Sequence, residues 1–167
     1  LKTIIKEKNI DFTVVNGENA DNTGRGITKE NSNSFFDLGV DVITSGNHIW
    51  DQKETMTFIE NEKRLLRPYN LTKGSPGKGF GIFQVKNKKF KIAVINLMGN
   101  IFMKKCDDLF QAAFQLKNLV RLRKDADFII VDVHGEITSE KMALGHFFDG
   151  EATVVVGTHT HVPTSDT

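Results

Sequence analysis

The sequence predicts a single domain of the α/β class, built in layers, over residues 1–167. Short apolar runs rich in β-branched residues alternate with amphipathic helical patterns, and this alternation is typical of layered α/β folds. Each apolar run ends in a polar, glycine-containing cluster. The length of 167 residues is also sufficient to bury one sizeable hydrophobic core.

Five apolar runs are expected to form buried strands, because each is short and bounded by glycine or polar residues. They cover residues 12–15, 40–45, 90–95, 128–133 and 152–156. Residues 67–89 contain two prolines and four glycines and predict a long loop or a hairpin.

Three helices are expected between the strands. The first spans Thr28 to Leu38 and is ended by Gly39. The second is capped by Asp107, and the third spans Thr138 to Phe147. The apolar face of the second helix has helical spacing and carries Leu109, Ala113, Leu116 and Val120.

Composition narrows the classes of partner. The chain has 22 basic and 21 acidic side chains, so a long nucleic acid is not expected as a stable partner and a membrane-surface role is disfavoured. No apolar run approaches the length of a membrane span.

The single cysteine, Cys106, excludes an internal disulfide and fits a reducing, cytoplasmic setting. A homo-oligomer stays open. The chain begins at Leu1, and we expect a domain that is partial at both ends.

Metal-ligand side chains follow four of the five expected strands. In open α/β sheets, ligands bind beyond the carboxyl ends of the strands. A set of imidazole, amide and carboxylate donors without thiolate suits Mn, Fe, Zn, Co or Ni. Each histidine taken alone could equally be structural, so the prediction depends on the clustering. The residues concerned are Glu18, Asn19, Asn47, His48, His134, His159 and His161.

Such a donor set predicts phosphoester chemistry. Two ions bridged by a carboxylate and a hydroxide suit in-line displacement at phosphorus, with the hydroxide as nucleophile. His48 is placed to protonate the leaving oxygen as a general acid, and Asp51 to orient that imidazole.

The sequence resembles the calcineurin-like metallophosphoesterases and, more closely, their YmdB-type branch. Six motifs in order carry the resemblance: Asn16-Gly17-Glu18-Asn19-Ala20, Gly46-Asn47-His48-Ile49-Trp50-Asp51, Arg67-Pro68-Tyr69-Asn70, Pro76-Gly77-Lys78-Gly79, Thr138-Ser139-Glu140-Lys141 and Gly157-Thr158-His159-Thr160-His161-Val162. It implies an α/β sandwich with mixed sheets and a dinuclear metal site at the carboxyl ends of the strands. It also implies hydrolysis of 2′,3′-cyclic nucleotides and other phosphodiesters.

Carried over by position, the resemblance makes Glu18 the bridging carboxylate and His48 the proton donor. Asn47, His134 and His159 would complete the shell of one divalent ion, whereas His161 and Asn19 would serve the other. The family also uses an aspartate after a first strand, which we expect upstream of Leu1.

Alternatives stay open at this point. The same centre could serve a phosphomonoesterase or a nuclease, or the chain could be a nucleotide-binding module with impaired catalysis. Trp50 is interpreted as a packing residue, with a base-stacking platform as the alternative, and Glu136 as a solvated loop carboxylate.

Overall fold

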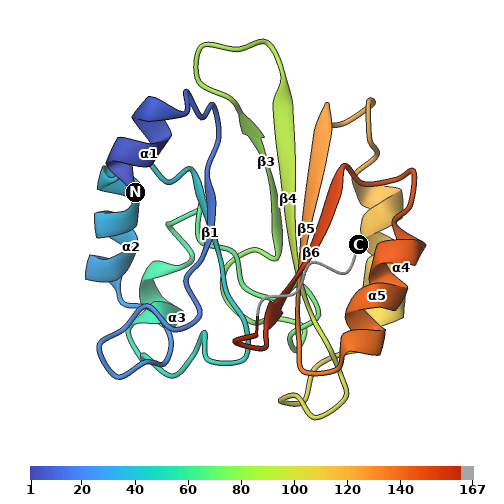
Figure 1. Cartoon of the computed structure of the whole chain (residues 1–167). Helices are drawn as coiled ribbons and strands as arrows, with labels where there is room; N and C mark the ends of the chain where they lie inside the picture. The colour runs from blue at the N-terminus through green and yellow to red at the C-terminus, as the bar shows by residue number, and fades with distance from the viewer. Residues whose placement is uncertain (163–167) are drawn as a thin grey trace.

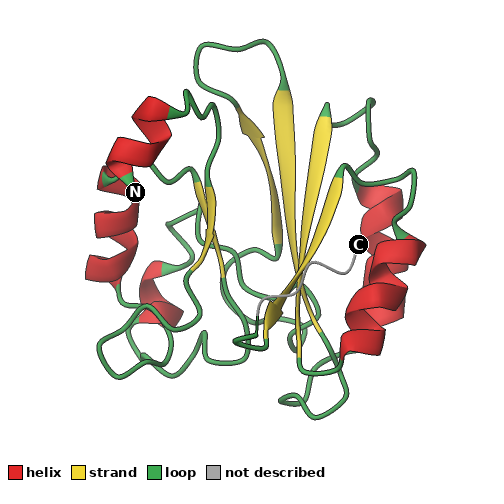
Figure 2. Cartoon of the chain, in the orientation of Figure 1, coloured by secondary structure: helices red, strands yellow, loops and turns green. Residues whose placement is uncertain are grey.

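The computed structural model describes residues 1–162 and contains two sheets lying side by side between two groups of helices (Figures 1 and 2). Helices α1 to α3 flank the small sheet, and α4 and α5 flank the large one. The elements are α1 (Lys2–Glu7), β1 (Val14–Asn16), α2 (Lys29–Asp37), β2 (Val42–Thr44), α3 (Thr55–Phe58), β3 (Phe80–Gln84), β4 (Lys91–Met98), α4 (Leu109–Leu119), β5 (Phe128–Gly135), α5 (Thr138–Phe147) and β6 (Val154–His159). Among these residues, no helix is long and apolar enough to cross a membrane.

The large sheet is mixed. Its strand order is β3-β4-β5-β6; β3 runs antiparallel to β4, and β4, β5 and β6 are mutually parallel. The small sheet pairs β1 and β2 in parallel. The expected α/β sandwich is therefore confirmed, and its large sheet is mixed. The pairing of β3 with β4 also shows that the hairpin alternative for residues 67–89 was the correct one, although Gly81 interrupts the apolar run of β3 and hides it from the sequence pattern.

Period-two alternation in β4 divides the core into layers. Ala93, Ile95 and Leu97 face α4 and α5 and pack in one buried cluster. Ile92 and Val94 point to the opposite side and pack in a second cluster between the two sheets. A third cluster fills the space between the small sheet and its helices. Every layer is thus closed by apolar side chains, as expected of a stacked α/β fold.

The three expected helices are present as α2, α4 and α5, with one correction to a cap, whereas α1 and α3 are not among the expected helices. Thr28 caps α2 through a reciprocal capping box, and Gly39 follows that helix with φ +98°, a conformation that favours glycine. Helix α5 has the expected bounds. Helix α4, however, is capped by Asp108, whose side chain accepts a hydrogen bond from the N–H of Gln111. Asp107 instead offers its carbonyl oxygen to Asn70.

The layer between the sheets changes from apolar to polar toward the carboxyl ends of the strands. On the inward face of β5, Ile130 is followed by Asp132, which is 3% exposed. The Asp132 carboxylate accepts hydrogen bonds from Asn16 Nδ2 at 3.0 Å and from Thr158 Oγ1 at 2.6 Å, and also from Thr44 Oγ1. Burial raises the pKa of Asp132, and these hydrogen bonds offset part of the rise. One side chain thereby joins β1, β2, β5 and β6.

A buried carboxylate also holds the loop after β4. Glu140, on α5 and 7% exposed, accepts the N–H of Asn100 at 3.0 Å. The Asn100 side chain in turn accepts the N–H of Leu109 at 2.8 Å, at the start of α4. Within this loop, burial and the nearby Asp107 raise the pKa of the Cys106 thiol to about 11.

Replacing Asp132 by alanine should destabilise the fold, because donors on three strands would lose their buried acceptor. We expect Asp132→Ala to lower the free energy of unfolding by about 3 kcal/mol, measured by urea denaturation. Asp149→Ala, which removes an exposed carboxylate from the turn after α5, is the matched control. An equal loss in both variants would show that Asp132 does not join the sheets.

The Cys106 thiol should resist alkylation in the folded chain. Its pKa of about 11 lies above the ordinary value of about 8.5, so the native state favours the protonated thiol. That preference stabilises the fold below about pH 8.5 and is lost as the pH rises toward 11. At pH 9 we expect iodoacetamide to react with the native chain at least about tenfold more slowly than with the urea-unfolded chain. Equal rates in the two states would contradict the shift.

Candidate metal centre

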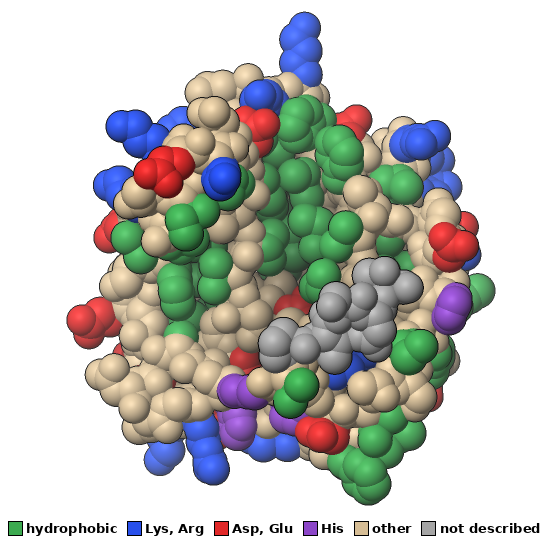
Figure 3. Space-filling model, viewed as in Figure 1, with side chains coloured by type: hydrophobic (Ala, Val, Ile, Leu, Met, Phe, Trp, Pro, Cys, Tyr) green, Lys and Arg blue, Asp and Glu red, His purple; other side chains and the backbone are tan. Residues whose placement is uncertain are grey.

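Four of the candidate ligands occupy the carboxyl ends of parallel strands. Glu18 follows β1, Asn47 follows β2, His134 is the second-last residue of β5, and His159 ends β6. The register of β5 and β6 pairs His134 with Thr158 and Gly135 with His159, which places the two imidazoles side by side. Figure 3 shows histidine side chains gathered at the lower edge of one face, below a hollow lined by apolar side chains.

Donor atoms converge on His134 Nε2. It lies 2.9 Å from Asn47 Oδ1, 3.2 Å from His159 Nδ1 and 3.4 Å from Glu18 Oε1. The side chains of His134 and Glu18 are 1% and 3% exposed. A Cβ atom at Gly46 would stand 2.2 Å from the His134 ring, so only glycine permits this approach. The glycine before Asn47 is therefore a packing requirement of the site.

Neighbouring groups fix the orientation of His134. The Thr158 hydroxyl has one proton, which it donates to the buried Asp132 carboxylate. At 3.1 Å from His134 Nδ1 it therefore accepts a hydrogen bond from that nitrogen. This leaves Nε2 to face Asn47, His159 and Glu18. Such outer contacts, which set the tautomer and direction of a histidine, are typical of metal ligands.

His159 is held in a similar way and at a cost in backbone strain. Its Nε2 lies 2.8 Å from the carboxylate of Glu136. Glu136 is an exposed residue in the loop after β5, as expected, and it also contacts the candidate centre. Burial and the nearby His134 lower the pKa of His159, and Glu136 offsets only part of this shift. The backbone of His159 has φ +91°, a strained conformation that is found mainly at functional sites.

The atoms around His134 Nε2 are all potential acceptors, so their lone pairs face one another. One further acceptor nearby, on Glu18, is buried without a partner among the described residues. A proton on His134 Nε2 could reach only one of its three neighbours, whereas a cation could be shared by several donors. Ligands about 2.1 Å from one ion lie about 3 Å apart, which matches the separations above. Glu18 Oε1 accepts the N–H of His48 at 2.6 Å, but Glu18 Oε2 is buried and has no hydrogen bond from any residue in the range 1–162.

The donor chemistry therefore fits a divalent ion bound by nitrogen and oxygen. Within residues 1–162, no group of three or more His, Cys, Asp or Glu side chains is arranged as a complete metal site. The close approach described above consists of three separate distances to His134 Nε2, and one of them involves the side-chain amide of Asn47.

His48 and Asp51 form a separate pair beside this cluster. His48 Nδ1 lies 2.6 Å from Asp51 Oδ2, and Lys104 Nζ lies 2.9 Å from Asp51 Oδ1. Partial burial acts to raise the pKa of Asp51, but the hydrogen bonds from Lys104 and His48 outweigh it and hold the pKa below its usual value. Both carboxylate oxygens are thus engaged, and the imidazole has its Nδ1 fixed with Nε2 left over. The geometry agrees with the orienting role expected for Asp51.

Two candidate ligands lie outside the convergent set. Asn19 donates its side-chain N–H to the carbonyl of Gly24 at 2.7 Å and is exposed. His161 follows β6, is exposed, and forms no hydrogen bond or ion pair with the described part of the chain. The roles of both residues stay predictions.

Sequence reasoning missed Asp132 and Glu136, which support the two central histidines. A signal for Asp132 was present: a carboxylate in the middle of a strand otherwise made of apolar residues is unusual.

Several known proteins are similar to this chain in sequence or in fold. The chain is 47% identical over 155 residues to a 2′,3′-cyclic-nucleotide 2′-phosphodiesterase of Bacillus subtilis, covering 93% of this chain and 57% of that protein. A crystal structure of a hypothetical protein from Thermus thermophilus superposes with a TM-score of 0.86 at 40% identity, over 99% of this chain and 62% of that one. A 5′-nucleotidase from Candida albicans shares the fold alone, with a TM-score of 0.59 at 16% identity over 96% of this chain and 36% of that one.

The chain thus shares its α/β fold with that 5′-nucleotidase. The chain spans just over half of the length of the Bacillus relative that it matches. The family model described as YmdB-like protein matches residues 1–167, and the chain belongs to that family.

Proposed function

We propose that this chain carries the metal-dependent centre of a phosphodiester hydrolase that acts on 2′,3′-cyclic nucleotides, a small-molecule substrate. The observation that carries the proposal is the convergence of Asn47, His159 and Glu18 on His134 Nε2, beside the His48–Asp51 pair. The activity named for the Bacillus subtilis relative supports this choice of substrate.

Glu18, Asn47, His134 and His159 would hold one divalent ion, with the unpartnered Glu18 Oε2 available to a second ion. Asn19 and His161 are the proposed further ligands of that second ion. When bound, the two ions supply positive charge to the phosphoryl oxygens and lower the pKa of attacking water.

Side chains of the protein supply proton transfer to the leaving group. His48 delivers a proton to the leaving oxygen of the phosphodiester, because its Nδ1 is engaged by Asp51 and its Nε2 is left for the substrate. Asp51 stabilises the charged imidazole and is itself fixed by Lys104. The backbone N–H of His48 binds Glu18 Oε1, so the proton donor and the proposed bridging carboxylate are mechanically connected.

The direct test compares substrates. We expect the full-length protein that contains this chain, supplied with Mn²⁺ or Zn²⁺, to hydrolyse 2′,3′-cyclic AMP in preference to 2′-AMP and to short RNA. The products are separated by chromatography, and the chelated protein is the control. Preference for the monoester would identify a phosphomonoesterase, and preference for RNA a nuclease. Binding of 2′,3′-cyclic AMP without turnover would favour a nucleotide-binding module. Each of these outcomes would overturn the proposal.

Two substitutions separate metal binding from proton transfer. Glu18→Gln should remove most of the bound metal measured by elemental analysis, because it neutralises the proposed bridge. His48→Ala should keep metal content near that of the parent and lower turnover by about 10²–10⁴-fold. His146→Ala, an exposed histidine on α5, is the matched control and should change neither quantity. Loss of metal in His48→Ala equal to its loss of activity would contradict the general-acid role.

A further inference from the structure

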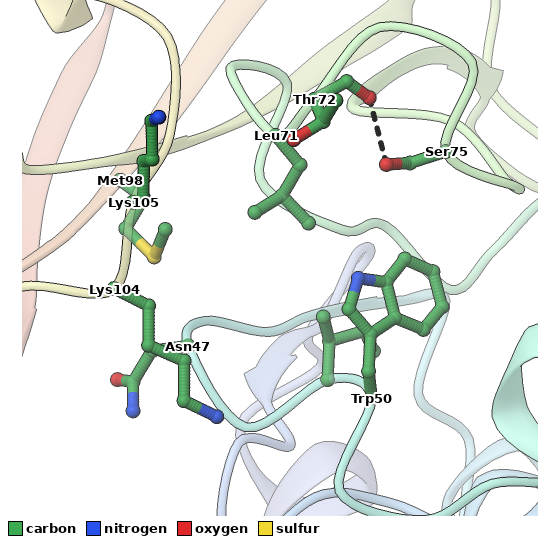
Figure 4. Close-up of a pocket in the computed structure, with 9 residues that line it drawn as sticks. Asn47, Trp50, Leu71, Thr72, Ser75, Met98, Lys104 and Lys105 are labelled. Atoms are coloured by element: carbon green, nitrogen blue, oxygen red, sulfur yellow. Dashed lines mark hydrogen bonds between the residues drawn. The ribbon is translucent and has the colours of Figure 1, made fainter.

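A half-open cavity adjoins the candidate metal centre through Asn47. Its volume is about 150 Å³, and a cavity of this size accepts one aromatic ring. Figure 4 shows side chains surrounding an open space, with Trp50 on one side, Leu71 above and Lys104 with Met98 opposite. The residues that line it are Asn47, Ile49, Trp50, Leu71, Thr72, Ser75, Met98, Lys104 and Lys105. Asn47 belongs both to this wall and to the atoms converging on His134.

Only part of the Trp50 surface faces the cavity. The residue is half-buried and packs against the hydrophobic cluster beneath the small sheet, and it also lines the cavity. The two interpretations of Trp50 are therefore compatible, since packing fixes the indole and leaves part of it available to a ligand. A fixed aromatic side chain is the usual platform for a planar, unsaturated ring.

The other walls suit a ring that carries polar atoms. Leu71 offers an apolar contact. Ser75 donates its hydroxyl proton to the Thr72 carbonyl at 2.7 Å and so keeps an oxygen able to accept from a ligand N–H. Lys104 and Lys105 place positive charge at the same cavity. Apolar walls with a few convergent polar groups are typical of small-molecule sites.

We propose that this cavity is the subsite for the heterocyclic base of a nucleotide phosphodiester, with Trp50 as its stacking surface. This inference rests on the proposed function. The base lies against Trp50 while the phosphate of the same molecule reaches the centre past Asn47. Lys104 connects the two regions, because it lines the base subsite and also fixes Asp51, the partner of His48. Trp50 thereby determines affinity for substrates that carry a base.

The binding test needs neither metal nor turnover. Trp50 is the sole tryptophan of the chain, so its fluorescence reports on the cavity directly. We expect saturable quenching by 2′,3′-cyclic AMP and by adenosine, and none by ribose 2′,3′-cyclic phosphate, which lacks the base. Absence of saturable quenching by both base-containing compounds, or equal quenching by the base-free compound, would overturn the inference.

The kinetic test uses Trp50→Leu, with Trp50→Phe to retain a ring. We expect Trp50→Leu to raise the KM for 2′,3′-cyclic AMP about tenfold and to leave kcat/KM for ribose 2′,3′-cyclic phosphate within about twofold, whereas Trp50→Phe recovers most of the loss. Phe114→Leu, which removes an exposed ring from α4, is the control and should match the parent. Equal losses on both substrates would assign Trp50 to packing alone.

The two tests also distinguish failure of this inference from failure of the proposed function. Base-dependent quenching with no hydrolysis of either cyclic phosphate would keep the subsite and reject the hydrolase. Hydrolysis of both compounds, unaffected by Trp50→Leu and without quenching, would keep the hydrolase and reject the subsite.

Discussion

The buried carboxylate of Asp132 is the interaction on which the two-sheet arrangement and the candidate site both depend. It draws donors from β1, β2 and β6 onto β5, so it sets the spacing of the sheets at the end where apolar packing stops. The same carboxylate takes the only proton of the Thr158 hydroxyl, and that hydroxyl then turns His134 toward the cluster. A single buried charge therefore serves architecture and chemistry together, in a layer where an unpaired carboxylate would be strongly destabilising.

Local sequence patterns were sufficient to predict most of the secondary structure. The strand runs, the glycine after the first expected helix and the helix over residues 138–147 follow from local sequence patterns, and the structure has elements at these positions. Where two adjacent aspartates competed for the cap of α4, the sequence alone offered no basis for choosing Asp108 over Asp107. Strand β3 was hidden because Gly81 breaks its apolar run, and pairing with β4 overrides that local weakness.

The candidate site was predictable in its central residues and not in its supports. Clustering at strand ends identified His134 and His159, since parallel strands bring their carboxyl ends to one edge. Their supporting carboxylates follow from register and backbone direction. Glu136 contacts His159, whose backbone has a positive φ, and neither composition nor spacing predicts this conformation. The uses of Trp50 likewise depend on which part of the indole the core leaves uncovered.

The wide sequence separation of the site residues bears on the order of folding. Asn16 and Asp132 are 116 positions apart, and Asn47 and His134 are 87 apart, whereas β3 and β4 join through a short turn. Contacts between distant segments form late, since the loop they close is entropically costly. Each sheet can acquire its own helices and apolar cluster first, and the cluster of donors arises only when the sheets dock. A cation bound by those donors would then stabilise the docked arrangement of the two sheets, because the unfolded chain has no comparable site for it.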